Sequence, residues 1–397
     1  MKFLYLIADG MGGRPLEALG GRTTMETAAT PNMDDLAAGG IVGLARTVPA
    51  DMPPGSDVAN MALLGFDPAA YHTGRGPIEA AAQGLDLSPD DLVWRMNLVR
   101  VTDLDVDGIM RDYSSGHITS EESRPLVERL QERLGDETFR FVPGVQYRHL
   151  LVQKGGKNAP EAALRIQPPH DITDKPIRES LSAFSRSAPL WDLLHEAAEV
   201  LAEDNPTRAN SIWPWGQGGP LALPDFARTF GMRGAVVSAV DLIKGLGRAA
   251  GMKVVDIPGA TGLLDTNYEG KVEAALEFLK DGDFVFVHLE GPDECGHGGD
   301  IECKIEAISR FDARVVAPLR EALHGEETAW LVTCDHHTPI AERTHTHDPV
   351  PFALHYPGAP ASGVAGFGEA AAASTGLVLE HGHELLPWAL GKLRGES

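Results

Sequence analysis

The sequence predicts an α/β protein with a mainly parallel sheet flanked by helices, plus a smaller inserted α+β subdomain. Short, nearly continuous apolar runs at residues 3–8, 284–287 and 330–332 indicate strands that are buried on both faces. Helical patterns lie between these runs, which is the alternation that parallel sheets require. The middle of the chain shows short alternating stretches and frequent turns instead. A length of 397 residues leaves room for both parts.

Three segments between the apolar runs have the periodicity of helices. Residues 31–38 follow Thr30, a candidate N-cap, and stop at Gly39. Residues 270–280 carry apolar side chains at helical spacing, and residues 303–319 form a longer amphipathic stretch. Each of these segments can therefore cover one face of the predicted sheet.

The inserted subdomain is indicated by a change of pattern. Residues 140–142 and 148–152 alternate between apolar and polar side chains, and the turn at residues 154–157 follows them. A Pro-Pro-His-Asp segment at residues 168–171 closes this region. We therefore expect a core formed by residues 1–102 and 175–397, and an inserted subdomain formed by residues 103–174.

Composition excludes several classes of function. The chain has 34 Lys+Arg and 57 Asp+Glu, a formal net charge of −23, which argues against a nucleic-acid-binding surface. No apolar run approaches the ~18 residues of a membrane span, and the N-terminal apolar run is better explained as a strand than as a signal peptide. Three cysteines are too few for a disulfide framework and favour a reducing cytosol. We therefore expect a cytoplasmic protein with no membrane or nucleic-acid partner.

Histidines and carboxylates gather near the C-terminal part of the chain. Seven of the 15 histidines lie between His288 and His347. They contribute to three chemically capable segments, at residues 293–297, 335–337 and 345–348. Each segment alone could be a surface pair, a capped turn or a polar loop. Together, and with Asp9 and Asp335 at the carboxyl ends of predicted parallel strands, they predict a dinuclear site for Mn²⁺, Zn²⁺ or Fe²⁺.

Ser56 is the candidate nucleophile. Two prolines and a glycine precede it, so the chain turns sharply just before the helical pattern that follows. Backbone N–H groups and the helix dipole at that position favour an alkoxide or a phosphate oxygen. The alternative is that Ser56 or Asp57 only caps the helix. The sequence contains neither a G-x-S-x-G elbow nor a G-x-x-x-x-G-K-[ST] loop, which disfavours those hydrolase and kinase classes.

These pieces resemble the cofactor-independent phosphoglycerate mutases of the alkaline phosphatase superfamily. The resemblance is strongest to the short, archaeal-type branch, which includes bacterial members proposed to be homoserine kinases. It runs through nearly the whole chain, in the motifs ADGMGGRP (8–15), TPNMDDLA (30–37), PPGSDVANMALLGFDP (53–68), YHTGRGPIEAA (71–81), RDYSSGHIT (111–119), PGVQYRH (143–149), NSIWPWGQG (210–218), SAVDLIKGLGR (238–248), HLEGPDECGHGGD (288–300), CDHHTPI (334–340) and RTHTHDPVPF (343–352).

The resemblance implies two divalent metal ions, typically manganese, with Zn²⁺, Mg²⁺ or Co²⁺ as alternatives, and no 2,3-bisphosphoglycerate. By position, one metal would be held by Asp293, His297 and His345, and the other by Asp9, Ser56, Asp335 and His336. His345, and not His347, aligns with the family's ligand. Ser56 matches the family's phosphorylated serine.

The implied reaction is a step of glycolysis and gluconeogenesis. Ser56 takes the phosphoryl group of 3-phosphoglycerate, the glycerate reorients, and its other hydroxyl takes the group back to give 2-phosphoglycerate. The inserted subdomain would hold the glycerate and exclude water, which would otherwise make the enzyme a phosphatase. The oligomeric state stays open.

Two departures from the family pattern concern the substrate. Residues 112–118 and 213–217 stand where archaeal mutases tend to carry arginines, and both variants match the branch proposed to phosphorylate homoserine. Four residues stay as candidate anion binders: Arg75, His117, His170 and Lys244. A homoserine kinase-like phosphotransferase and a phosphomonoesterase are therefore the alternative functions.

Overall fold

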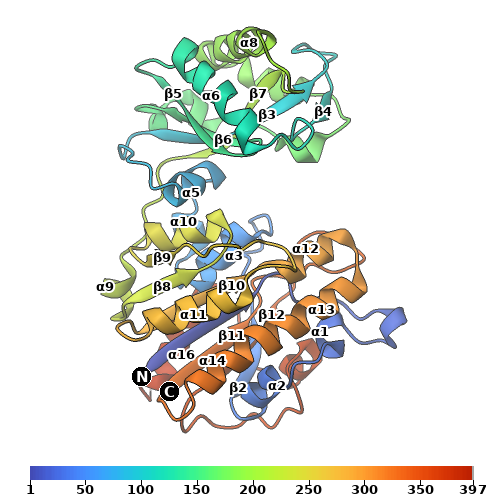
Figure 1. Cartoon of the computed structure of the whole chain (residues 1–397), viewed down its shortest axis with the longest axis vertical. Coiled ribbons are helices and arrows are strands. Elements are labelled where there is room, and N and C mark those ends of the chain that lie inside the picture. The colour runs from blue at the N-terminus through green and yellow to red at the C-terminus, as the bar shows by residue number, and fades with distance from the viewer. Residues whose placement is uncertain (396–397) are drawn as a thin grey trace. The chain divides into compact units, whose positions relative to one another are not determined.

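The computed structural model describes residues 1–395, which form two compact units (Figure 1). The first unit contains residues 1–72 and the chain from residue 222 onward, and the second contains Thr73–Leu221. The second unit extends beyond the expected segment 103–174 at both ends. The reason is the hydrogen-bond ladder, because the strand Leu92–Val101 before that segment pairs with Arg148–Gln153 inside it. The strand Ser211–Gly218 after the segment in turn pairs with Leu92–Val101.

The first unit is built on an eight-stranded sheet in the order β13-β2-β12-β11-β1-β10-β8-β9. β1 lies parallel to both β10 and β11, so the three apolar runs identified in the sequence are neighbours in the sheet. β12 is antiparallel to both β11 and β2, and the other pairs are parallel. The bounds are β1 Lys2–Ala8, β2 Ile41–Ala45, β8 Gly234–Val237, β9 Lys253–Val255, β10 Phe284–Leu289, β11 Thr328–Thr333, β12 Val350–His355 and β13 Val378–Leu379. The mainly parallel α/β core is thus confirmed.

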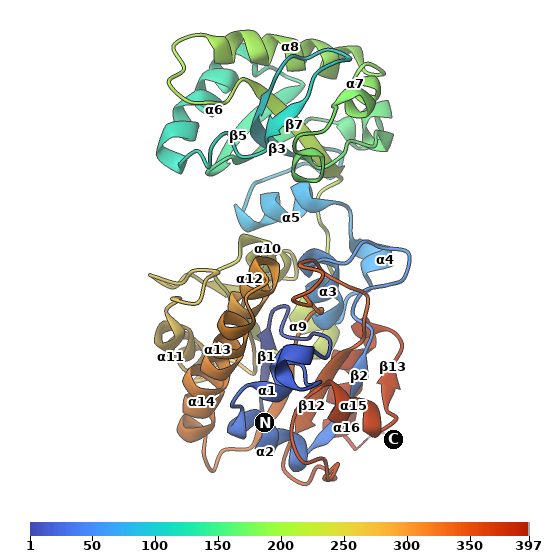
Figure 2. The same ribbon diagram turned by 90° about the vertical axis from the view of Figure 1, so that its right-hand side faces the viewer.

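Helices flank this sheet (Figure 2). The helical bounds are α1 Thr24–Thr27, α2 Pro31–Ala38, α3 Ser56–Leu63, α4 Pro68–Tyr71, α9 Phe226–Phe230, α10 Asp241–Ala249, α11 Tyr268–Phe278, α12 Gly291–Gly298, α13 Ile301–Phe311, α14 Ala317–Ala322, α15 Glu369–Ser374 and α16 Leu385–Leu393. A π-helical turn at Asp312–Val316 joins α13 to α14, so the long helix predicted at 303–319 is real and slightly longer.

The N-terminus of α2 is capped differently from the sequence prediction. Thr30 makes no capping hydrogen bond to the helix backbone. The carboxylate of Asp312, about 280 residues away along the chain, accepts hydrogen bonds from the backbone N–H groups of Asn32 (3.3 Å) and Met33 (2.8 Å). Thr30 thus occupies the predicted N-cap position, but a tertiary contact and not its own side chain supplies the acceptor.

The second unit contains an antiparallel sheet in the order β4-β3-β6-β5, with β7 also pairing with β3. Its elements are α5 Arg75–Ala82, β3 Leu92–Val101, β4 Met110–Asp112, α6 Ser120–Leu134, β5 Phe139–Val145, β6 Arg148–Gln153, α7 Arg178–Phe184, α8 Ala188–Ala202 and β7 Ser211–Gly218. Trp94 on β3 and Trp213 on β7 are fully buried in its hydrophobic core. The unit is an α+β fold, as expected from the sequence.

Two of the three cysteines form a disulfide, which the cysteine count did not predict. Cys295 on α12 is bonded to Cys303 on α13, and their Cα atoms lie 5.5 Å apart. Gly299, which ends α12 with a φ of +69°, turns the chain so that α13 folds back onto α12. Cys334 is a buried free thiol. Among residues 1–395, no helix combines the length and the apolar character that crossing a membrane needs.

His149 makes the stability of the second unit depend on pH. Its side chain on β6 is fully buried, its Nδ1 accepts a hydrogen bond from the Gly144 N–H at 3.0 Å, and burial lowers its pKa to about 3. The unfolded chain takes up this proton near pH 6.5, whereas the folded chain does so only near pH 3. Stability is therefore complete above pH 6.5 and falls as the pH drops, by about 1.4 kcal/mol per pH unit at most.

We expect the substitution His149→Gln to flatten this acid limb of the stability curve. The measurement is urea unfolding between pH 4 and 7, followed by tryptophan fluorescence. His324→Gln, at an exposed position of the first unit, is the control and should keep the wild-type slope. A His149→Gln variant with an unchanged slope would show that the buried imidazole does not drive the pH dependence.

Candidate metal centre

The candidate centre lies at the carboxyl edge of three adjacent parallel strands. Asp9 directly follows β1, His288 is near the end of β10, and Asp335 and His336 follow β11. The register pairs Ile7 with both His288 and Thr333, which brings these strand ends side by side. Ligands bind at this edge in open α/β sheets.

The first group of potential ligands is Asp9, Asp335 and His336, which are all fully buried. One ligand atom of each lies within 4.8 Å of the others. His336 Nε2 lies 3.4 Å from Asp9 Oδ1 and 3.4 Å from Asp335 Oδ2. Ser56 Oγ lies 3.1 Å from the same Nε2 atom, so the candidate nucleophile adjoins this group.

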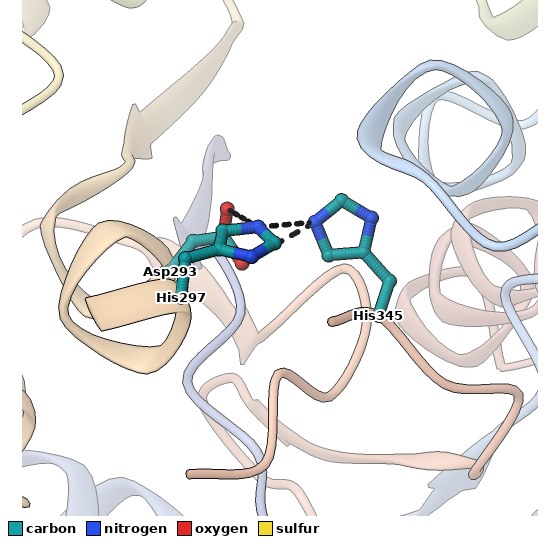
Figure 3. Close-up of side chains that lie close together, drawn as sticks. All are labelled: Asp293, His297 and His345. Carbon is teal, nitrogen blue, oxygen red and sulfur yellow. Dashed lines mark hydrogen bonds and ion pairs between the residues drawn. The ribbon is translucent and has the colours of Figure 1, made fainter. Parts of the chain in front are cut away.

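The second group is Asp293, His297 and His345 (Figure 3). Asp293 and His297 are four residues apart on α12 and so face the same way, while His345 reaches in from a loop. His297 Nε2 lies 3.2 Å from Asp293 Oδ2 and 2.9 Å from His345 Nε2, and His345 Nε2 lies 3.5 Å from Asp293 Oδ1. The three side chains thus converge on one point.

Backbone carbonyls orient both imidazoles of the second group. His297 Nδ1 donates to the Arg343 carbonyl at 2.9 Å, and His345 Nδ1 lies 3.4 Å from the Pro54 carbonyl. A proton on Nδ1 leaves the lone pair of Nε2 available as a ligand. The two groups are adjacent, because the rings of His336 and His345 lie 4.0 Å apart between centroids.

The donor set fits divalent cations. Both carboxylate oxygens of Asp9 are buried, and no residue among 1–395 donates a hydrogen bond to them. His288 Nε2 lies 3.1 Å from Asp9 Oδ2, but without the geometry of a hydrogen bond. Burial raises the pKa of Asp9 well above its usual value, and the neighbouring carboxylates raise it further. A bound cation would stabilise the ionised form of such a buried carboxylate, and mixed oxygen and nitrogen ligands suit transition-metal ions.

Further side chains hold the ligands in place. Asn60 Nδ2 donates to Asp335 Oδ2 at 2.8 Å and to the Ser56 carbonyl at 2.9 Å, and the Gly10 N–H donates to Asp335 Oδ1 at 3.0 Å. The Thr338 hydroxyl donates to the carboxylate of Asp293. Sequence reasoning missed Asn60 and Thr338. Of these two residues, only Asn60 could have been found from the sequence, because it lies one helical turn after Ser56 in the predicted helix.

Ser56 is the first residue of α3, and Gly55 occupies the N-cap position. Neither Ser56 nor Asp57 caps the helix with its side chain, so the capping alternative is wrong. Asp57 is instead buried, with its Oδ2 atom 2.9 Å from His72 Nε2. The hydroxyl of Ser56 is therefore available at the positive end of a helix.

The four candidate anion binders are divided between the two units. Lys244, in the first unit, is paired with Asp256 at 2.9 Å. His170 and Arg75 both contact Trp215 in the second unit, at 5.4 Å between ring centroids and 6.0 Å from Cζ to the ring centroid, respectively. The fourth, His117, is in the same unit, with its ring centroid 6.5 Å from that of Tyr113.

We refer to Arg75, Arg95, Tyr113, His170 and Trp215 as the Trp215 cluster. The guanidinium carbon of Arg95 lies 4.9 Å from the Trp215 ring centroid, and Arg95 is also paired with Glu79 at 2.9 Å. The rings of Tyr113 and His170 are 6.1 Å apart. Sequence reasoning did not assign Arg95 or Trp215, because nothing local marks two residues from strands β3 and β7 as partners.

His347, which the sequence analysis placed outside the ligand set, points elsewhere. Its Nε2 lies 2.8 Å from the Met52 carbonyl, and its side chain is exposed.

Comparison with known proteins identifies the family. A family model described as 2,3-bisphosphoglycerate-independent phosphoglycerate mutase matches residues 37–206. A probable enzyme of that name from Geobacter sulfurreducens is 44% identical, over 99% of this chain and 100% of its own. The chain belongs to the 2,3-bisphosphoglycerate-independent phosphoglycerate mutase family. A mutase of this family from Methanosarcina mazei is 48% identical over 89% of this chain and 90% of its own.

Solved structures support the same family fold. The PH0037 protein from Pyrococcus horikoshii has a TM-score of 0.83 and 30% identity, covering 100% of this chain and 98% of its own. The cofactor-independent phosphoglycerate mutase from Thermoplasma acidophilum has a TM-score of 0.67 and 28% identity, covering 99% and 100%. The mutase family inferred from the motifs is thus confirmed.

In this member of the mutase family, the two histidines of the 345–348 segment should differ in metal binding. We expect His345→Ala to weaken binding of one Mn²⁺ equivalent at least about tenfold, because the second group loses one of its three ligands. His347→Ala is the matched control and should bind manganese like the wild type. Equilibrium dialysis with elemental analysis measures both. Equal losses in the two variants, or none in either, would contradict the assignment.

Proposed function

We propose that this protein interconverts 3-phosphoglycerate and 2-phosphoglycerate without 2,3-bisphosphoglycerate, through a phosphoserine at Ser56. The observation that carries the proposal is the position of the Ser56 hydroxyl, 3.1 Å from His336 Nε2, beside the buried carboxylates of Asp9 and Asp335. Membership of the mutase family supports the substrate.

Two divalent metal ions are part of this proposal, and we propose manganese. Asp9, Ser56, Asp335 and His336 would hold one, and Asp293, His297 and His345 the other. When bound, such ions lower the pKa of a hydroxyl and neutralise phosphoryl oxygens. Mixed carboxylate and imidazole ligands suit Mn²⁺ better than Mg²⁺, which prefers oxygen ligands.

The proposed reaction has two transfers that balance. In the first, Ser56 Oγ bonds to phosphorus, the bond between phosphorus and the oxygen on C3 breaks, and the serine proton ends on that oxygen. In the second, the hydroxyl on C2 bonds to phosphorus, the bond to Ser56 Oγ breaks, and the proton returns to the serine. The N-terminus of α3 stabilises the negative charge that passes through Oγ, and Asn60 keeps Asp335 in place.

The second unit is proposed to hold the glycerate and to exclude water while Ser56 is phosphorylated. Its Trp215 cluster carries Arg75 and Arg95, whose guanidinium groups suit a carboxylate. Trp215 and Glu79 hold Arg95 in place, so little conformational entropy is lost when an anion binds. Slow hydrolysis of the phosphoserine is expected wherever this shielding fails.

The aromatic content of the same cluster favours a second candidate function. Tyr113 packs edge-to-face against both Tyr147 (5.5 Å between centroids) and His170 (6.1 Å). Aromatic faces attract an ammonium group. Phosphoryl transfer to homoserine, which carries one, is therefore the alternative that the experiment must separate from the mutase reaction.

The proposal also places the enzyme in the cytoplasm. Phosphoglycerates are multiply charged, and transfer of such anions into an apolar phase is strongly unfavourable. The enzyme must therefore share a compartment with the reactions that form and consume its substrates.

The decisive experiment offers three substrates to the manganese-loaded protein. With 3-phosphoglycerate and no bisphosphoglycerate, we expect 2-phosphoglycerate, detected by a coupled enolase assay. Chelation should abolish the activity and added manganese should restore it. Parallel reactions contain homoserine with ATP, and a generic phosphomonoester. Turnover of homoserine alone would overturn the mutase proposal, and full activity in chelator would overturn the metal dependence.

We expect Ser56→Ala to lose at least about 1,000-fold in turnover, because the variant lacks the hydroxyl proposed to accept the phosphoryl group. Incubation with ³²P-labelled substrate should leave acid-stable label on the wild type and none on the variant. Ser374→Ala, at an exposed serine on α15, is the matched control and should be labelled normally. An active, labelled Ser56→Ala enzyme would refute the nucleophile.

A further inference from the structure

The second unit contains a cavity of about 750 Å³ that no part of the proposed mechanism uses. Three arginines from separate segments line it: Arg100 at the end of β3, Arg111 on β4, and Arg208 in the loop before β7. The antiparallel pairing of β3 with β4 and with β7 brings the three segments together. The Trp215 cluster contributes none of the residues that line this cavity.

The other polar groups of the cavity are already hydrogen-bonded within the protein. Thr102 Oγ1 accepts from the Ile109 N–H at 3.0 Å. The side-chain amide of Asn210 accepts from the Val101 N–H and donates to the Val101 carbonyl. The Asp112 carboxylate accepts from the backbone N–H groups of Ser114 (2.8 Å) and Gly116 (2.6 Å). The guanidinium groups are therefore the donors that the cavity can offer to a ligand.

Two carboxylates offset part of the charge of the three arginines: Asp112, which lines the cavity and pairs with Arg100 in the β3–β4 register, and Asp174. Arg111 is paired with Asp174 at 3.2 Å, and both side chains are largely exposed. Among residues 1–395, no carboxylate lies within ion-pair distance of Arg100 or Arg208, and neither side chain makes a hydrogen bond. Because like charges around one cavity repel each other, a bound anion would lower the energy of this arrangement.

A turn in the chain makes room for Arg208. Gly116 has a φ of +81°, and a Cβ atom at this position would lie 3.1 Å from Arg208 Cδ. Its neighbours Ser115 and His117 also have positive φ values, of 53° and 55°. The turn is held by the Asp112 hydrogen bonds, so the stem of Arg208 packs beside it, and Arg208 as a whole is exposed.

We propose that Arg100, Arg111 and Arg208 form a binding site for a compact polyanion that carries at least two phosphoryl groups. Guanidinium forks bind phosphoryl oxygens through paired hydrogen bonds, and three of them match a ligand with several negative charges. No aromatic side chain lines the cavity, so a nucleotide base would have no stacking partner. The net charge of −23 also opposes extended polyanions such as nucleic acids.

The test uses the whole, metal-free chain in chelator, with inorganic pyrophosphate as the probe in isothermal titration calorimetry. Removing metal excludes binding at the candidate metal centre. We expect saturable binding by the wild type, and at least about tenfold weaker binding by Arg100→Gln and Arg208→Gln, because each loses one charge-assisted hydrogen-bonding group. Arg133→Gln, at an exposed arginine of the same unit paired with Glu203, is the matched control and should bind like the wild type.

Circular dichroism confirms that each variant is folded before it is titrated. The proposal is overturned if the wild type shows no saturable binding, or if Arg100→Gln and Arg208→Gln bind like the control. Loss of binding in Arg75→Gln alone would place the anion at the Trp215 cluster and would also overturn it. A parallel titration with citrate tests the ligand class, since equal affinity for a tricarboxylate would contradict the requirement for phosphoryl groups. No outcome depends on mutase activity.

Discussion

The buried carboxylate of Asp9 is the constraint on which the candidate centre depends. It follows β1, the strand between β10 and β11, and its two oxygens receive no hydrogen bond from residues 1–395. A charge in such a place costs several kcal/mol unless an opposite charge compensates it. The imidazoles of His288 and His336 lie 3.1 and 3.4 Å away, but burial lowers the pKa of both, so they favour the neutral form. A cation bound at this edge of the sheet, where Ser56 lies, would therefore stabilise the ionised form of Asp9.

The sequence allowed prediction of those features that are local along the chain. Asp9 and Asp335 each follow an apolar run, and parallel strands present their carboxyl ends at one edge. The spacing of Asp293 and His297 is likewise a property of a single helix. By contrast, Ser56 and His336 are 280 residues apart, and only the family resemblance indicated that they meet. Thr338 was missed because its bond to Asp293 depends on how a loop folds over α12.

The same distinction explains the differences in the fold. The cap of α2 comes from Asp312, which no pattern near Thr30 could reveal. The second unit reaches from Thr73 to Leu221 because β3 pairs with both β6 and β7, and these pairings lie far apart along the chain. The disulfide between Cys295 and Cys303 forms because α13 folds back on α12. The number of cysteines in the sequence carries no information about this turn.

The acidity of the chain and an anionic substrate are compatible because the charges are distributed unequally. The second unit has 16 Lys+Arg against 23 Asp+Glu, so most of the net charge of −23 belongs to the first unit. There, on the proposed function, carboxylates attract the cations that in turn attract phosphate, so acidic residues serve phosphate binding indirectly. The second unit has no such ligand group among its residues and offers arginines instead. Since salt screens charges beyond about 8–10 Å, an anion near either unit responds mainly to these local groups and little to the total charge.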